Sequence, residues 1–111
     1  MEQKKKKICI AGKVSGLEIA EYTANFHIAE EFLLSKGYEV INPIEHCDIE
    51  MEWSDCMINC LKLLSGCDGI YILNNWSTSI GARIEQLFSC RMRDINPSFE
   101  IMYESDFDIY Y

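Results

Sequence analysis

Four short apolar runs along the chain have the length and composition of buried β-strands. They span residues 7–11, 38–41, 68–73 and 99–103. Isoleucine, valine and tyrosine, which favour strands, recur in these runs, and turn-forming Gly, Asn or Pro follows the first three of them. The pattern predicts four strands, each ending at a loop.

Between these runs, apolar residues recur every three or four positions, which is the period of an amphipathic α-helix. The first such stripe runs from Tyr22 to Leu33 and stops before Gly37, a residue type that commonly ends helices. The spacing predicts three helices, the first from about residue 21 to Gly37 and the others over residues 53–65 and 79–93.

Strands that alternate with helices predict a parallel sheet covered by helices on both faces. We expect an α/β fold with a single domain over residues 1–111, a flavodoxin-like (Rossmann-like) three-layer sandwich with a four- or five-stranded parallel sheet. With the first strand in the centre, the loops at Gly12, Asn42 and Asn74 meet at the carboxyl edge of the sheet. Ligands bind at that edge in folds of this class.

Two stretches at that edge carry candidate chemistry. Gly12 and Gly16 frame the first loop and let backbone amides approach a ligand closely, while Ser15 adds a hydroxyl. A tight turn that needs positive φ explains the same glycines equally well. In the third predicted helix, Glu85 lies one turn after Gly81 and is the candidate catalytic acid.

The charge of the chain limits its partners. A net charge of −8 at pH 7 argues against a DNA- or RNA-binding protein, because phosphate contacts need clustered Lys and Arg. Four lysines, Lys4 to Lys7, precede the first strand and are expected to be solvated. No stretch approaches the roughly 18 apolar residues of a membrane span. We therefore expect a cytoplasmic protein without a membrane partner.

The six cysteines can form three bridges in an oxidising compartment. The sequence shows no export signal, since the apolar run after the lysines is only about five residues long, and we therefore expect free thiols. His46, Cys47, Cys56 and Cys60 are near one another in sequence. Because no C-x-x-C pair is present, we expect no metal site.

Several pieces of the chain, in this order and spacing, carry a family resemblance. They are Ile8-Cys9-Ile10-Ala11-Gly12 with Ser15-Gly16, Asn25-Phe26 with Ala29-Glu30, Val40-Ile41-Asn42-Pro43, Trp53-Ser54-Asp55 with Met57, Cys67-Asp68-Gly69-Ile70, and Trp76 with residues 77–85. Together they resemble the nucleoside 2-deoxyribosyltransferase superfamily, and within it a branch of short domains of unknown function. The resemblance covers nearly the whole chain.

The resemblance implies chemistry at the N-glycosidic bond of a nucleoside or nucleotide, by transfer to another base or by hydrolysis, without a cofactor. Family members use a glutamate nucleophile, preceded six residues earlier by a residue that grips the 5′ end of the sugar. These positions are Glu85 and Ser79 here. An aspartate at the gripping position suits a free 5′-hydroxyl and a serine suits a 5′-phosphate, so Ser79 favours a nucleoside 5′-monophosphate.

Further site residues follow from the same resemblance. Lys13 and Ser15 are expected on the phosphate side, and Trp76 is expected to stack on the base. The other expected contacts to the substrate are Gly12, Gly16, Asn42, Ser77 and Gly81. Cys60 stands where the family has an aspartate that helps to protonate the leaving base, Cys9 stands in place of a tyrosine, and Lys13 in place of a proline.

Two functions remain open from the sequence. The first is an enzyme that cleaves or exchanges the N-glycosidic bond of a (deoxy)nucleoside 5′-monophosphate through Glu85. The second is a nucleotide-binding or sequestering protein of the same fold that has lost efficient catalysis, because a Cys60 thiol is a weak proton donor. The family commonly builds its site between subunits, which implies a homo-oligomer. The aromatic residues of the tail, Phe107 to Tyr111, fit either contacts with a second subunit or a frayed end.

Overall fold

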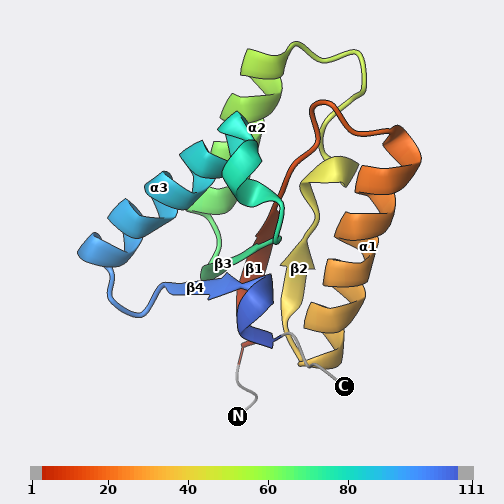
Figure 1. Ribbon diagram of the computed structural model, residues 1–111. Coiled ribbons are helices and arrows are strands. Elements are labelled where there is room, and N and C mark those ends of the chain that lie inside the picture. Colours follow the sequence, from red (N-terminus) through yellow and green to blue (C-terminus); the bar gives the residue numbers. More distant parts are fainter. Residues whose placement is uncertain (1–3, 108–111) are drawn as a thin grey trace.

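Helices and strands alternate along the whole described chain. The computed structural model describes residues 4–107. The elements are β1 (Lys7–Ala11), α1 (Ile19–Ser35), β2 (Glu39–Ile41), η1 (Pro43–Glu45), α2 (Trp53–Ser65), β3 (Gly69–Ile72), η2 (Trp76–Thr78), α3 (Ile80–Ile95), β4 (Glu100–Tyr103) and η3 (Glu104–Phe107). Figure 1 shows them in sequence colours. No helix in the described part of the chain is long and apolar enough to cross a membrane.

The four described strands form one parallel sheet in the order β2-β1-β3-β4. The register pairs Cys9 with Ile41 on one side and with Ile70 on the other. Strand β1 is therefore central, and all the strands end at the same edge. This order is the one expected for a flavodoxin-like α/β fold, and the prediction of that fold is confirmed.

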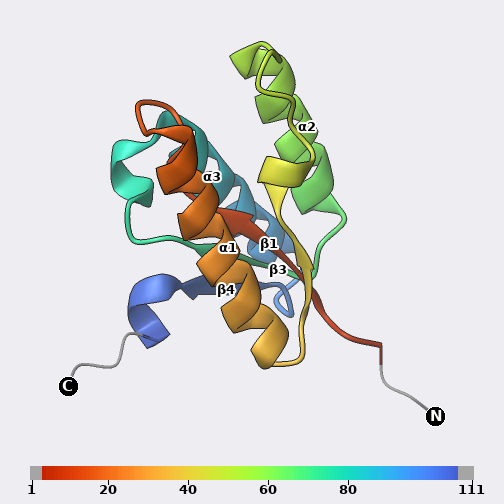
Figure 2. The same cartoon turned by 90° about the vertical axis from the view of Figure 1, so that its right-hand side faces the viewer.

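Alternate residues of the strands build two separate apolar cores. Ile8 and Ile10 of β1 pack with Phe26, Ala29 and Leu33 of α1. The intervening Cys9 and Ala11 point to the opposite face, where they pack with residues of α2, β3 and the end of α3. Figures 1 and 2 show the resulting three layers, with α1 on one face of the sheet and α2 and α3 on the other.

The predicted boundaries differ from the observed ones by one or two residues. Helix α1 begins at Ile19 rather than at about residue 21, and α3 continues to Ile95 rather than ending at residue 93. In the tail, Phe107 packs on Phe32 and Tyr71 of the same chain, with ring centroids 5.4 and 6.2 Å away. Phe107 thus has an intramolecular position, whereas Tyr110 and Tyr111 lie outside the described residues.

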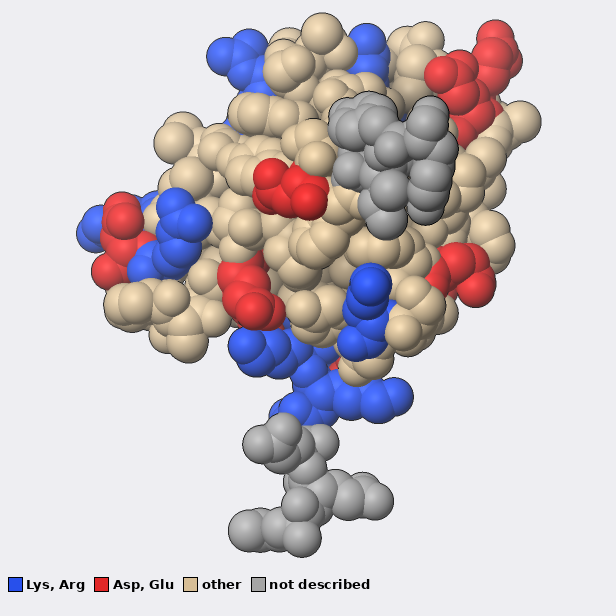
Figure 3. All heavy atoms as spheres, turned by 60° about the horizontal axis from the view of Figure 1, so that its bottom comes forward, with Lys and Arg blue, Asp and Glu red and all other residues tan. Residues whose placement is uncertain are grey.

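The lysine cluster lies far from the carboxyl edge of the sheet. Lys4 to Lys6 are exposed where the chain approaches the start of β1, and Figure 3 shows basic side chains gathered there. Lys6 forms an ion pair with Glu100 at 3.4 Å. Because β1 runs from this end towards its ligand edge, the cluster is expected to contribute little to binding at that edge.

Candidate functional site

A cavity of about 860 Å³ lies at the carboxyl edge of the sheet. Its walls come from the loop after β1, the first turns of α1, the loop between η1 and α2, and the first turns of α2 and α3. Most of the lining side chains are apolar, and Asp48 and Glu85 are its acidic members among the described residues. Its size and its apolar wall with few polar groups are typical of a small-molecule site.

Glu85 is the main polar group inside this cavity. It lies in the second turn of α3, its side chain lines the cavity, and it is only 6% exposed. Its Oε2 atom has no hydrogen-bond partner in the described part of the chain. Burial raises the pKa of Glu85 from 4.5 to about 8, so without a ligand the carboxyl is mostly protonated at neutral pH.

Ser79 caps the same helix at the cavity wall. Its Oγ accepts a hydrogen bond from the Ala82 backbone N–H at 3.2 Å. The first backbone N–H groups of an α-helix have no partner within the helix, and the helix dipole makes this end attractive to an anion. Ser79 and Gly81 both line the cavity, so the start of α3 can hold a phosphate there.

The loop after β1 lies close to the segment after β3. Gly12 and Ser15 line the cavity, and a Cβ at Gly12 would lie 2.5 Å from Leu73 Cδ1, so glycine is needed there for space. Lys13 connects the two loops, because its backbone N–H donates to Asn75 Oδ1 at 3.0 Å and its Nζ donates to Thr78 Oγ1 at 3.3 Å.

Five of the predicted binding residues do not line the cavity: Lys13, Gly16, Asn42, Trp76 and Ser77. Gly16 has a φ of +88°, which is the conformational reason for glycine at that position. Asn42 caps η1 by accepting from the Ile44 N–H, and it donates to Glu30 Oε1 at 2.9 Å. Trp76 packs on Tyr103, with ring centroids 5.9 Å apart, because η2 turns it towards β4.

Other aromatic and sulfur-containing side chains occupy the cavity wall instead. Tyr22 of α1 and Trp53 and Met57 of α2 line it, and a Cβ at Gly81 would lie 3.6 Å from Met57 Sδ. None of these three is among the site residues predicted from the sequence. Trp53 could have been predicted from its position, because it is a tryptophan in the first turn of a helix that follows a loop at the ligand edge.

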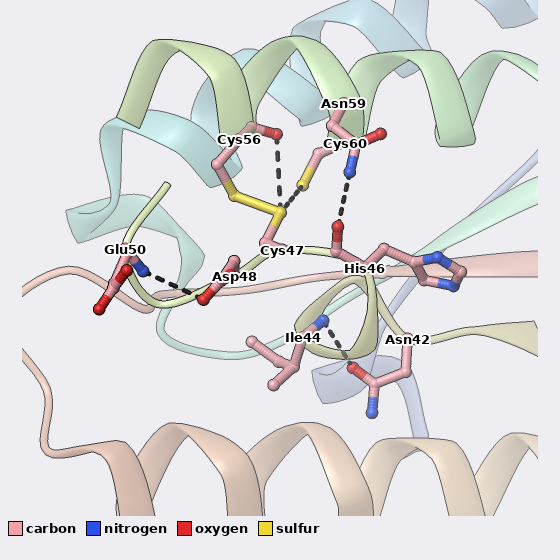
Figure 4. Close-up of a disulfide and its surroundings, with 9 residues drawn as sticks. All are labelled: Asn42, Ile44, His46, Cys47, Asp48, Glu50, Cys56, Asn59 and Cys60. Atoms are coloured by element: carbon pink, nitrogen blue, oxygen red, sulfur yellow. Dashed lines mark hydrogen bonds between the residues drawn. A yellow bond between two sulfur atoms is a disulfide. The ribbon is translucent and has the colours of Figure 1, made fainter. Parts of the chain in front are cut away.

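The expectation that all six cysteines are free thiols is wrong. Cys47 and Cys56 form a disulfide, because η1 turns the chain back so that the following loop lies against the start of α2 (Figure 4). The free cysteines among the described residues are Cys9, Cys60, Cys67 and Cys90.

Cys60 lies beside this disulfide and lines the same cavity as Glu85. Its Sγ is 3.7 Å from the Sγ of Cys47. Burial, and after it the negative charge of Glu85, raise the pKa of the Cys60 thiol to about 12. At the position where the resemblance implies an aspartate, the protein therefore holds a neutral thiol.

Comparison with known proteins gives a family for the chain but no activity. No curated protein matches it. A family model described as "Domain of unknown function (DUF4406)" matches residues 6–93, which include every strand except β4 and all the polar residues of the cavity named above. The match extends over most of the chain, and the protein belongs to the DUF4406 family.

Proposed function

We propose that this protein cleaves or exchanges the N-glycosidic bond of a (deoxy)nucleoside 5′-monophosphate, with Glu85 as the nucleophile. The observation that carries this proposal is the buried, partly unsatisfied Glu85 carboxyl in an apolar cavity. Burying an acid without a full set of partners is costly, and such groups are found mainly where their chemistry is used. The implied likeness to nucleoside 2-deoxyribosyltransferases supplies the reaction class.

The reaction uses the carboxylate form of Glu85. When the bond between C1′ and the base breaks, the base leaves with the bonding electron pair and positive charge develops on the sugar. The Glu85 carboxylate attacks C1′ and forms a glycosyl ester. Water then releases the free sugar phosphate, or a second base accepts the sugar. A sugar cation beside Glu85 favours the ionised carboxylate and offsets the effect of burial on its pKa.

The start of α3 supplies the phosphate site in this proposal. Ser79 precedes Glu85 by six residues, which is about 9 Å along a helix axis. A single nucleotide can thus reach both the helix N-terminus with its phosphate and Glu85 with its C1′ atom. No lysine, arginine or histidine lines the described cavity, so the N–H groups at the start of α3 and the hydroxyls of Ser79 and Ser15 are the available donors.

The base would lie against the apolar wall. Tyr22 and Trp53 are the aromatic side chains best placed to contact it, in place of Trp76. The Cys60 thiol lies on the same wall and is neutral, so it can donate only a weak hydrogen bond to the leaving base. This feature favours the second candidate function, a protein that binds the nucleotide without turning it over.

A product assay separates the two candidates. The protein is incubated with each of the deoxynucleoside 5′-monophosphates, and free base is measured by chromatography. We expect release from at least one of them, and a loss of at least about 1,000-fold for Glu85→Gln, because the nucleophile is removed. Glu31→Gln, at an exposed position of α1, is the matched control and should retain full activity.

The opposite results are equally informative. Release that persists in Glu85→Gln would remove Glu85 from the mechanism. Tight binding of one nucleotide, measured by calorimetry, with no base released from any of them would leave the binding protein as the function.

We also propose that the protein is a homo-oligomer. Ile80, Leu87 and Ile95 project from one side of α3 and are 70–72% exposed, although they are large apolar side chains. A second copy of the chain would cover this surface. A mass measurement in solution that gave only the monomer would contradict the proposal.

A further inference from the structure

Three cysteine sulfurs converge on the wall of the cavity. Cys47 comes from the loop after η1, and Cys56 and Cys60 lie one turn apart on the same side of α2. Their Sγ atoms all lie within 4.8 Å of one another, and all three residues line the cavity (Figure 4). The disulfide joins two of these sulfurs and leaves the third unused.

The spacing of the sulfurs fits thiolate coordination of a metal ion. In a tetrahedral zinc site the Zn–S distance is about 2.3 Å, which places neighbouring sulfurs about 3.8 Å apart. The Sγ atoms of Cys47 and Cys60 are 3.7 Å apart already. The Cα atoms of Cys47 and Cys56 are 5.7 Å apart, which is compatible with two separate thiolates on one ion once the disulfide is reduced.

We propose that Cys47, Cys56 and Cys60 form a three-thiolate site for Zn²⁺ when the Cys47–Cys56 disulfide is reduced, with the fourth coordination position open to the cavity. Three protein ligands with an open fourth position are the pattern of reactive rather than purely structural zinc sites. The site goes beyond the proposed function and does not depend on it.

Zinc binding requires that the Cys47–Cys56 disulfide is first reduced. A dithiol gives two electrons and two protons to the Cys47–Cys56 bond and becomes a disulfide itself. Zn²⁺ then replaces the protons of the three thiols and forms three Zn–S bonds, and water or a ligand in the cavity occupies the remaining position. The disulfide form lacks two of the three ligands and cannot bind the ion in this way.

The surroundings keep the three cysteines together after reduction. Asn59 Nδ2 donates to the His46 backbone oxygen at 2.7 Å, which holds the loop carrying Cys47 against α2 independently of the disulfide (Figure 4). The charge at the cavity also favours a cation, since Asp48 lines it and no described basic side chain does. The His46 imidazole points away from the sulfurs in Figure 4, so the fourth position is not filled by this neighbour.

Cobalt(II) provides the probe, because thiolate coordination gives it a near-ultraviolet charge-transfer band and tetrahedral geometry gives it intense visible bands. The full-length protein is reduced with a dithiol, desalted under nitrogen and titrated with Co²⁺. We expect both sets of bands to reach a plateau at one Co²⁺ per chain, Zn²⁺ to displace them, and the oxidised protein to give neither.

Serine variants locate the ligands. Cys47→Ser, Cys56→Ser and Cys60→Ser should each weaken Co²⁺ binding by more than the roughly 10–100-fold that loss of a second-shell partner costs. Cys90→Ser, a half-buried free cysteine on α3 outside the cluster, is the matched control and should bind as the unchanged chain does.

Two results would overturn the metal site. One is the absence of a charge-transfer band in reduced protein whose helix content, followed by circular dichroism, is intact; if reduction lowers the helix content, a failure of Zn²⁺ to restore it counts against the site in the same way. The other is equal Co²⁺ binding by Cys60→Ser and Cys90→Ser. Both readouts follow the metal and not turnover, so their failure is distinct from a failure of the proposed glycosidic chemistry.

Discussion

The two faces of the sheet are built from different kinds of residues. On the α1 face, apolar side chains such as Ile10, Phe26 and Leu33 form the core, and the buried Asn42 beside α1 is hydrogen-bonded to Glu30 and to the Ile44 N–H. On the face covered by α2 and α3, buried Glu85 and Ser89 each have a side-chain oxygen with no partner among the described residues. The first face has the composition of a stabilising core, whereas the second gives up stability at two buried polar groups, of which Glu85 lies beside the cavity.

The largest expected effect tests this loss of stability on the α2–α3 face. The ordinary pKa of Glu85 is 4.5 and the folded value is about 8, so above pH 4.5 the unfolded chain binds fewer protons than the folded one. Folding stability therefore falls as pH rises, mainly between these two values. The Glu85→Gln variant lacks this loss, and its stability relative to the unchanged chain should rise by about 4 kcal/mol between about pH 4 and about pH 9.

Urea denaturation across that pH range measures the difference. Other titrating groups are common to both chains and cancel in the comparison. A difference that stayed constant with pH would mean that Glu85 ionises normally in the folded protein, and the contrast between the two faces would then disappear.

The next effect tests the apolar face. Leu33 is fully buried against the sheet, and Leu33→Ala should lower the free energy of unfolding by about 3 kcal/mol because it leaves a cavity in the core. Leu34→Ala, at a neighbouring position that is 48% exposed, is the matched control and should change stability by less than about 0.5 kcal/mol.

The same variants show whether the two faces are independent. Leu33→Ala should leave nucleotide binding per folded molecule unchanged, as measured by calorimetry at low temperature. Weaker binding in Leu33→Ala, with Leu34→Ala normal, would show that a change deep in the α1 core reaches the cavity wall, which Ile10 and Phe26 of the same core help to form.

The smallest effect separates the two roles of Ser79. Ser79→Ala removes the cap on the Ala82 N–H and should cost about 1 kcal/mol of stability. Ser79→Asp keeps a capping oxygen and should recover that stability, yet its charge should repel a 5′-phosphate and shift the preference towards nucleosides. Ser77→Ala, outside the cavity lining, serves as the control for both measurements. If Ser79→Asp bound nucleoside monophosphates as tightly as the unchanged chain, Ser79 would have no role in phosphate binding and would act only as a helix cap.

Most of the fold was predictable because local pattern and packing agree. The apolar runs are short and alternate with helical stripes, and only a parallel sheet with helices on both faces buries all of them. The predicted helix over residues 53–65 coincides with α2 (Trp53–Ser65). The errors of one or two residues at other ends fall where a helix begins or ends before any buried side chain fixes it, as at exposed Ile19.

The candidate site was predictable only in part. Glu85, Ser79 and Gly12 line the cavity, because each lies just after a strand or in the first turns of the helix that follows, and their roles toward a substrate stay predictions. The positions of Cys47 and Trp53 depend instead on the path of residues 43–52, a segment without the hydrophobic periodicity of a helix or strand. The 3-10 turn at Pro43–Glu45 sets that path, and it creates both the disulfide and the aromatic wall.

The two hydrogen bonds of Lys13 to the third loop make the cavity asymmetric. They connect the segments that follow β1 and β3 on one side of the cavity, so a movement of either segment would have to break these hydrogen bonds or move the other segment as well. The opposite border, residues 46–52, contacts the rest of the wall through the Asn59 hydrogen bond and the Cys47–Cys56 disulfide. That border is held by a covalent bond while the Cys47–Cys56 disulfide is intact, so the redox state of two sulfurs determines how firmly this side of the cavity is fixed.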